Sequence, residues 1–232
     1  MKLGDNISSL NIPLSLKSLK HIFSLIYKNK SPIRIFHNYF LKSLVINGKT
    51  IDLGCGHHSS YLEFLEKKSD YKIFFADKDI RDQKNYFQVD LDKKLLINDN
   101  EFDTVLLFNV LEHVYNYKGL IKEINRILKK RGKLEIFVPF MHRYHEDPKD
   151  VFRPTHAYLK KLLDEAGFEV KVYLIGVGPL SVCSEILFKY TKFKFIKVLL
   201  VIISILLDKI IKIFSKDHNT FYTGIHCTCE KK

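Results

Sequence analysis

A short apolar strand that runs into a glycine turn is the feature that most constrains this chain. The segment 50–56 (Thr-Ile-Asp-Leu-Gly-Cys-Gly) starts with residues that suit a buried strand and ends at two glycines. Because glycine has no Cβ, the backbone at Gly54 and Gly56 can turn sharply and lie close to a ligand. The next apolar run ends in Asp77, at about the separation where dinucleotide folds place a carboxylate on a ribose hydroxyl. This pattern predicts a nucleoside-containing cofactor over the first two strands of an open α/β sheet.

The turn lacks the third glycine of a dinucleotide fingerprint. That glycine would let a helix pack closely beneath a pyrophosphate, and its position is occupied by Ser59. The turn also contains His57 and His58. We therefore predict a nucleoside cofactor without phosphates. For the turn taken alone, the alternative is an ordinary strand–turn–helix that contains glycines.

Several motifs, taken in order, resemble the class I S-adenosylmethionine-dependent methyltransferases, and most closely their type 11 members. The resemblance covers about residues 33–178 and returns near the C-terminus. The matching segments are 51–56, Asp77, 87–90, 102–114, 123–128 and 132–139. One departure is 130–132 (Lys-Arg-Gly), where relatives have a proline and two glycines, and it affects a turn rather than the chemistry.

The resemblance implies S-adenosylmethionine as the cofactor and methyl transfer as the reaction. The glycine turn would lie along the methionine part, Asp77 would bind the ribose, and Asp90 with Leu91 would border the adenine. Asn109 through His113 follow a buried strand, and ligands of open α/β sheets bind beyond the carboxyl ends of the strands. Turn formation is the alternative for Asp90, and a structural role is the alternative for His113. The residues expected at the cofactor site are Asp52, Gly54, Cys55, Gly56, Asp77, Lys78, Asp90, Leu91, Asn109 and His113.

Strand and helix patterns alternate along the chain as they do in a doubly wound α/β fold. With the family resemblance, they predict a Rossmann-like, seven-stranded sheet whose last strand is antiparallel. A helix is expected at about 117–130 with Gly132 just past its end, and another after an N-cap at Thr155. We predict one methyltransferase domain over 1–232, made of N-terminal helices (15–46), a cofactor-binding core (47–178), an apolar helical insertion (179–219) and a closing strand (220–230).

A polar loop, 139–154, follows the fifth strand, where substrate contacts are expected. His142 and His145 are candidate general bases, because a histidine that titrates near neutrality can take a hydroxyl proton. The two histidines and nearby carboxylates also suit a metal ion, but no companion ligand pattern is present, and we predict no metal. The candidate substrate-binding residues are Arg143, Tyr144, Asp147 and Arg153.

The loop loosely resembles those of methyltransferases found with bacterial surface-polysaccharide enzymes. That resemblance implies O-methylation of a saccharide or of a lipid-linked glycan hydroxyl. The alternatives are methylation of nucleic acid or of a small metabolite, and a non-catalytic scaffold that keeps the nucleotide fold. The net charge of +12 comes with lysines scattered along the chain and no compact basic block with aromatics. We therefore expect a generally basic surface, with nucleic acid disfavoured as a partner.

The segment 193–214 is unusually apolar, but its longest run without charge is too short to cross a bilayer. On a helix, Lys197, Ser204, Asp208 and Lys212 fall close to one stripe and leave a very broad apolar surface. Such a helix is expected to be covered by the monomer itself, by a membrane surface or by a second copy in a homodimer.

The four cysteines include no CxxC pair, and this argues for a reducing compartment without structural zinc. The N-terminus lacks a long uncharged apolar core, so no cleavable secretion signal is predicted. We expect a cytoplasmic protein for which 193–214 offers a means of lying at the inner face of the membrane.

Overall fold

The computed structural model describes residues 6–10, 12–56, 59–79, 85–146, 149–215 and 218–232. The chain divides into two compact units. Unit 1 comprises residues 1–43, 139–144 and 173–225, and unit 2 comprises residues 44–138, 145–172 and 226–232.

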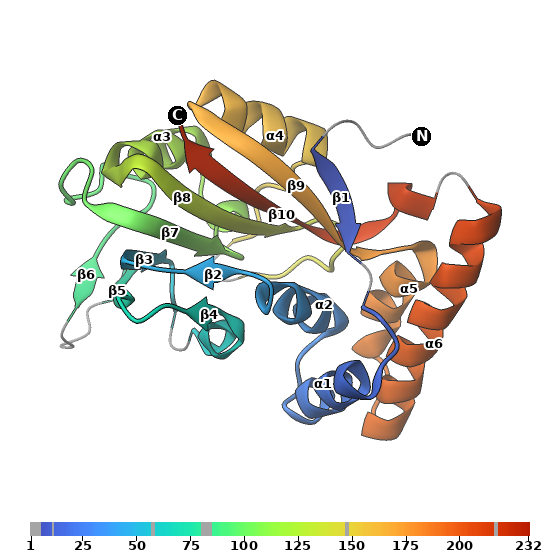
Figure 1. Cartoon of the computed structure of the whole chain (residues 1–232). Helices are drawn as coiled ribbons and strands as arrows, with labels where there is room; N and C mark the ends of the chain where they lie inside the picture. The colour runs from blue at the N-terminus through green and yellow to red at the C-terminus, as the bar shows by residue number, and fades with distance from the viewer. Residues whose placement is uncertain (1–5, 11, 57–58, 80–84, 147–148, 216–217) are drawn as a thin grey trace. The chain divides into compact units, whose positions relative to one another are not determined.

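Unit 2 holds the alternating strands and helices that the sequence predicted (Figure 1). Its elements are β2 (Val45–Ile46), β3 (Lys49–Leu53), η1 (Ser60–Phe64), β4 (Glu66–Lys67), β5 (Lys72–Asp77), β6 (Tyr86–Gln88), β7 (Phe102–Phe108), η2 (Leu111–His113), α3 (Tyr117–Ile127), α4 (His156–Glu165) and, except for its last residue, β8 (Leu128–Pro139). β9 (Phe168–Val177) and β10 (Tyr222–Lys231) contain residues of both units.

Eight of the described strands form a sheet in the order β1-β9-β10-β8-β7-β3-β5-β6, and β2 and β4 form a separate two-stranded sheet. The pairs from β8 to β6 are parallel, and β10 runs opposite to β8 (Figure 1). The predicted α/β fold with a parallel sheet and one antiparallel strand is confirmed. β1 (Ile7–Leu10) adds an edge strand that the sequence did not predict.

The central strands are apolar because the sheet buries them. All but one residue of β7 is buried, as its nearly continuous apolar run predicted, and Ile51 and Leu53 of β3 are also fully buried. β3 pairs with β5 on one side and with β7 on the other. The carboxyl ends of these three strands therefore lie side by side in unit 2.

The predicted helix 117–130 ends earlier than expected, at Ile127. Leu128 is fully buried and pairs with Phe102 as the first residue of β8, so strand pairing replaces the last helical turn. The register shifts before Thr104 pairs with Lys133, and Arg131 adopts a φ of 60° in this irregular stretch. The prediction of Gly132 as the residue just past the helix was wrong. In contrast, α4 begins as predicted, because Thr155 Oγ1 accepts a hydrogen bond from the Tyr158 amide.

Unit 1 is mainly helical. Its helices are α1 (Leu16–Tyr27), α2 (Pro32–Leu41), α5 (Pro179–Phe188) and α6 (Lys194–Phe214), with a short η3 (His218–Thr220). Within this unit α6 contacts both α5 and α1, and α2 contacts α1 and α5. None of the helices among the described residues combines the length and the apolar character that crossing a membrane requires.

A buried aspartate on α6 holds the start of α5. Asp208 Oδ1 accepts the Leu180 amide at 3.0 Å, and Oδ2 accepts the amide and the hydroxyl of Ser181 at 2.7 and 2.6 Å. A carboxylate at a helix N-terminus is stabilised by the unpaired amides and by the helix dipole. The stripe of α6 that contains Asp208 therefore faces the interior of unit 1.

Candidate functional site

The glycine turn stands at the carboxyl end of β3. Gly54 and Gly56 have φ values of 71° and 56°, which favour glycine over other residues. The Gly54 amide donates to the Ala76 carbonyl of β5 at 2.7 Å. A Cβ on Gly54 would lie 2.6 Å from the Val110 side chain, whereas a Cβ on Gly56 would meet nothing within 4 Å among the described residues. Gly54 therefore serves close packing, and Gly56 borders open space.

Asp77 connects the ends of β3 and β5. Its Oδ2 accepts the Gly56 amide at 2.7 Å, and its Oδ1 accepts the Lys78 amide at 2.7 Å. The Lys78 carbonyl accepts a hydrogen bond from Gln88 at 3.2 Å. The carboxylate is only half-buried, so it fixes the turn while part of it stays accessible.

Tyr86, at the start of β6, contacts the same turn and was not predicted from the sequence. Its hydroxyl lies 2.8 Å from Cys55 Sγ and donates to the Gly56 carbonyl at 3.5 Å. Its ring stacks on Phe75 of β5, with centroids 6.0 Å apart. Tyr86 belongs to no sequence motif, so its contact with the turn becomes visible only through the pairing of β6 with β5.

Asp90 and Leu91 follow β6. The Asp92 amide donates to Asp90 Oδ1 at 3.2 Å, and Lys93 Nζ lies 3.2 Å from Oδ2. The Asp92 amide and Lys93 together lower the pKa of Asp90. Asp90 therefore forms a local turn, which is the alternative to an adenine contact that the sequence left open for this residue. Leu91 is half-exposed beside it.

Asp52 lies beneath the turn and is fully buried in β3. Burial raises the pKa of Asp52 to about 6, and the charge of Asp77 adds to the rise, while hydrogen bonds from Ser59 and Tyr61 oppose it. Ser59 donates to Oδ2 at 2.5 Å, and Oδ1 has no hydrogen-bond partner among the described residues. This position makes Asp52 a support of the turn.

Asn109 and His113 follow the end of β7, as predicted. Asn109 has a φ of 56°, and its amide donates to the Phe137 carbonyl at 2.9 Å. His113 belongs to η2, and its Nδ1 lies 2.7 Å from the Lys149 carbonyl. This contact positions the ring of His113 against the loop that follows β8.

The loop histidine His145 packs against His113, with ring centroids 5.0 Å apart at nearly a right angle. His145 Nδ1 lies 3.3 Å from Asp150 Oδ2, and Asp150 forms a two-point ion pair with Arg153. Burial acts to raise the pKa of Asp150, but Arg153 and the His145 amide outweigh it and hold that pKa below its usual value. Arg153, predicted as a substrate contact, is therefore engaged within the loop.

Glu112 joins the two histidines in a compact group. One ligand atom from each of Glu112, His113 and His145 lies within 4.8 Å of the others. Glu112 is fully buried, and its Oε1 lies 3.7 Å from His113 Nε2. Two imidazoles and a carboxylate are competent ligands for a transition metal, so Glu112, His113 and His145 are the residues of unit 2 that could hold one. The pair that the sequence suggested for a metal, His142 with His145, is a different one.

His142 belongs to unit 1, where it meets a carboxylate of α5. Its Nδ1 lies 2.8 Å from Glu185 Oε1, and Glu185 Oε2 accepts the Ile33 amide at 2.7 Å. Because a carboxylate only accepts, this contact favours a proton on Nδ1 and leaves Nε2 able to take one.

His142 and Glu185 also border a pocket of about 430 Å³ in unit 1. Arg143, Tyr144, Lys189 and Tyr190 provide polar and aromatic groups, and three apolar side chains complete the wall. The lining residues are Met141, His142, Arg143, Tyr144, Val182, Glu185, Ile186, Lys189 and Tyr190. The predicted substrate residues Arg143 and Tyr144 are thus brought together with His142. Asp147 lies outside the described residues.

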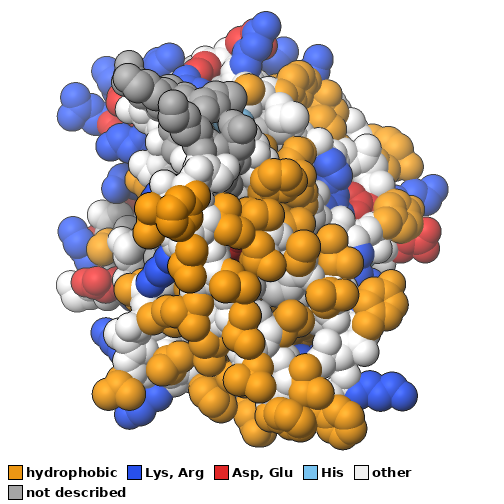
Figure 2. All heavy atoms as spheres, turned by 90° about the vertical axis from the view of Figure 1, so that its right-hand side faces the viewer, with side chains coloured by type: hydrophobic (Ala, Val, Ile, Leu, Met, Phe, Trp, Pro, Cys, Tyr) orange, Lys and Arg blue, Asp and Glu red, His pale blue; other side chains and the backbone are white. Residues whose placement is uncertain are grey.

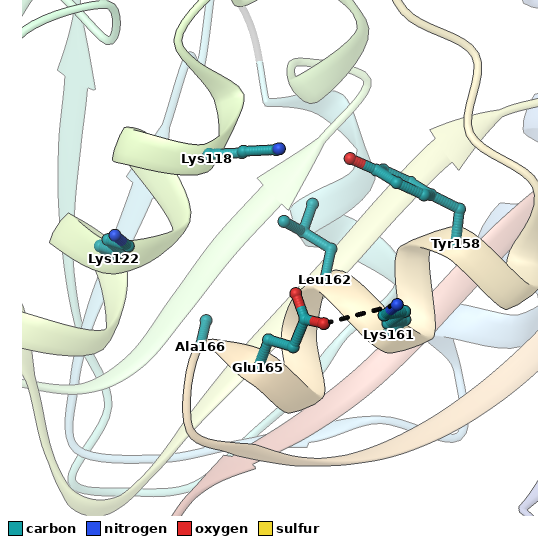
Figure 3. Close-up of a pocket in the computed structure, with 7 residues that line it drawn as sticks. All are labelled: Lys118, Lys122, Tyr158, Lys161, Leu162, Glu165 and Ala166. Carbon is teal, nitrogen blue, oxygen red and sulfur yellow. Dashed lines mark ion pairs between the residues drawn. The ribbon is translucent and has the colours of Figure 1, made fainter.

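Figure 3 shows another hollow, of about 400 Å³, which lies between α3 and α4 of unit 2. Lys118 points across it from α3 towards Tyr158 of α4, and Lys161 is 3.7 Å from Glu165. The lining residues are Lys118, Lys122, Tyr158, Lys161, Leu162, Glu165 and Ala166. It contains none of the predicted site residues, so we keep the candidate site at the carboxyl ends of the strands.

A family comparison agrees with this placement. Residues 27–171, more than half of the chain, match a family model described as a methyltransferase domain. The chain belongs to this methyltransferase family. The family match covers the glycine turn, Asp77 and the loop with both candidate histidines.

The chain is similar to a curated protein in sequence and to solved structures in fold. An uncharacterized protein of Methanocaldococcus jannaschii is 36% identical over 95 residues, which are 38% of this chain and 39% of that protein. A chain in the complex of the Haloferax volcanii Trm112 methyltransferase activator with a methyltransferase has a TM-score of 0.54 at 13% identity, covering 92% of this chain and 96% of that one. An S-adenosylmethionine-dependent methyltransferase from Mesorhizobium loti has a TM-score of 0.53 at 11% identity, covering 86% and 98%. At these identities the two structures show the fold.

The buried Asp52 predicts a distinctive pH dependence of stability. Its folded-state pKa of about 6 lies above the ordinary 3.8, so the folded protein holds this proton more tightly than the unfolded chain. The contribution of Asp52 to stability should therefore fall as the pH rises from about 4 to about 6. Across this window the unfolding free energy of the wild type should fall relative to that of Asp52→Asn, by up to about 3 kcal/mol.

Urea unfolding at several pH values in this window measures the effect. Asp70→Asn, which alters an exposed aspartate of unit 2, is the matched control and should leave the wild-type slope unchanged. Identical slopes for the wild type and Asp52→Asn would contradict the assignment of a raised pKa.

Proposed function

We propose that this protein transfers a methyl group from S-adenosylmethionine to a hydroxyl of a saccharide or of a lipid-linked glycan. The observation that carries the cofactor part is the junction of the glycine turn with Asp77 in a chain of the methyltransferase family. S-adenosylmethionine supplies a methyl group that its sulfonium already activates, so the protein mainly orients the reactants.

The proposed cofactor contacts follow the carboxyl ends of β3, β5, β6 and β7. Gly56 borders open space, and each Asp77 oxygen accepts one amide, which leaves lone pairs for ribose hydroxyls. The turn after β6 would border the adenine. The proposed set is Asp52, which supports the turn from beneath, with Gly54, Cys55, Gly56, Asp77, Lys78, Asp90, Leu91, Asn109 and His113. We add Tyr86, because its hydroxyl contacts the glycine turn.

The pocket beside His142 is the proposed acceptor site. Tyr144 and Tyr190 offer aromatic faces, and Arg143 offers donors, a combination that suits a sugar with apolar faces and polar edges. His142 is the first candidate base, because Glu185 favours the tautomer that carries its proton on Nδ1 and none on Nε2. The acceptor oxygen would gain the methyl group as its proton passes to Nε2, while the carbon–sulfur bond breaks and a neutral thioether leaves.

His145 is the second candidate base. Asp150 and Arg153 both approach its Nδ1, at 3.3 Å, and they favour opposite tautomers. The aspartate would accept a hydrogen bond from a protonated Nδ1, whereas the arginine would donate one to an unprotonated Nδ1. The contacts of His145 therefore select one tautomer less clearly than the contact of His142 with Glu185.

The cofactor assignment predicts a binding difference between two neighbouring aspartates. The wild type should bind S-adenosylmethionine in a calorimetric titration, and Asp77→Ala should weaken binding at least about tenfold, because charge-assisted hydrogen bonds are lost. Asp79→Ala, which removes an exposed carboxylate two residues later, should bind like the wild type. Folded wild type that fails to bind would favour the scaffold alternative, and equal binding by both variants would exclude Asp77 as a contact.

The acceptor assignment predicts that His142→Asn abolishes turnover and spares the cofactor. Methyl transfer from labelled S-adenosylmethionine is measured with three acceptor pools: polyprenyl-linked saccharides, total RNA and small metabolites. We expect label in the saccharide pool, a loss of about a hundredfold or more in His142→Asn, and unchanged cofactor affinity. A larger loss in His145→Asn would move the base to His145, and label in RNA or in metabolites would overturn the saccharide assignment.

A further inference from the structure

An extended apolar surface covers one side of unit 1 (Figure 2). On α6, six large apolar side chains are between 44% and 77% exposed, and helical geometry places them within an arc of about 120°. They are Phe195, Leu199, Ile203, Leu206, Ile210 and Ile213, which we call the α6 face. Exposed Ile186 and Leu187 of α5 and exposed Phe23 and Tyr27 of α1 belong to helices that contact α6, and exposed Tyr190 follows α5. Proteins rarely leave so many large apolar side chains in water without a partner.

The α6 face points outward because the opposite side of the helix packs inside unit 1. Val198, Val201, Ser204, Ile205 and Asp208 are buried there, whereas Lys212 of the predicted polar stripe is exposed. Turning the apolar arc inward would expose Asp208 and remove its hydrogen bonds to the start of α5. The described part of unit 1 therefore leaves the broad apolar arc of α6 uncovered.

Nearly all of the net charge belongs to the same unit. Unit 1 has 15 Lys and Arg against 4 Asp and Glu, a net +11, whereas unit 2 has 23 against 22, a net +1. Among the described residues of unit 1 the acidic ones are Glu185 and Asp208, and both are buried. Lys and Arg are present in both units, but acidic residues balance them only in unit 2.

Exposed lysines accompany the apolar arc. Lys194, Lys209 and Lys212 of α6, and Lys189 and Lys192 just before it, are all exposed. On the helix, the lysines lie outside the arc of the α6 face. Lys209 flanks the arc, so its long side chain can place the ammonium group at a lipid headgroup while the apolar arc enters the acyl boundary. Lys194 and Lys212 lie toward the opposite side of the helix and add to the positive charge of unit 1.

We propose that the α6 face docks unit 1 on the surface of an anionic lipid bilayer, with α6 lying in the plane of the membrane. The apolar arc supplies hydrophobic burial, and the positive charge of unit 1 complements anionic headgroups. This docking does not depend on the methyl-transfer proposal.

Charge selects lipid over a second copy of the chain. A two-fold dimer through the α6 face would bring the same lysine-bearing surface of each copy together, without exposed acids among the described residues of unit 1 to pair with them. RNA would satisfy the lysines but would leave the apolar arc uncovered. An anionic bilayer satisfies both features of the surface.

Vesicle sedimentation of the full chain tests the proposal. We expect binding to vesicles that contain phosphatidylglycerol, weaker binding at high salt, and little binding to phosphatidylcholine alone. Leu199→Glu with Ile203→Glu should weaken binding to the anionic vesicles about tenfold or more, because these substitutions put charge into the apolar arc. Lys209→Glu with Lys212→Glu should weaken it through charge alone.

Leu96→Glu with Tyr115→Glu is the matched control, because both residues are exposed apolar positions of unit 2. It should bind vesicles like the wild type, and circular dichroism should show all variants folded. The proposal fails if the wild type stays in the supernatant with anionic vesicles at low salt, or if the Leu199/Ile203 variant binds them fully. It also fails if light scattering shows a dimer that this variant dissociates. Cofactor titration of the same samples keeps this result separate from the methyl-transfer proposal.

Discussion

The carboxylate of Asp77 is the interaction on which the candidate site depends. It accepts the amide of Gly56 from the turn after β3 and the amide of Lys78 after its own strand, so one side chain sets the spacing of two strand ends. Parallel strands alone would bring those ends to the same edge of the sheet. Asp77 fixes the distance between these strand ends while its own carboxylate stays half-exposed. The buried Asp52 supports the turn from below.

Predictions that rest on short patterns agree with the structure. The glycine turn, the strand that ends at Asp77 and the Thr155 cap depend on neighbours within a few residues, and sequence spacing contains that information. The end of α3 does not depend on near neighbours alone. Leu128 leaves the helix because it pairs with Phe102 in the sheet, a contact between positions 26 residues apart in the numbering. For the same reason, neither Tyr86 at the turn nor Glu185 beside His142 could be predicted.

The α6 helix shows that a sequence pattern can be correct without determining which side of the helix is buried. Its polar stripe and broad apolar surface were both visible in the sequence, and amphipathic helices usually turn the apolar side inward. Here the buried side is mixed, because Val198, Val201 and Ile205 pack inside unit 1 beside Ser204 and Asp208, and Asp208 holds the start of α5. The charge of unit 1 then coincides with its apolar surface. The proposed arrangement gives unit 2 the cofactor and gives unit 1 the acceptor pocket and the lipid contact.

Hydrogen–deuterium exchange with and without S-adenosylmethionine tests this assignment of the cofactor most directly. If the turn and Asp77 hold the cofactor, protection should appear in the peptides that cover 49–56 and 72–78, whose amides include the two that Asp77 accepts. The peptides of α6 should exchange as before. Unchanged exchange in both turn peptides, at a cofactor concentration that calorimetry shows to be saturating, would contradict the account.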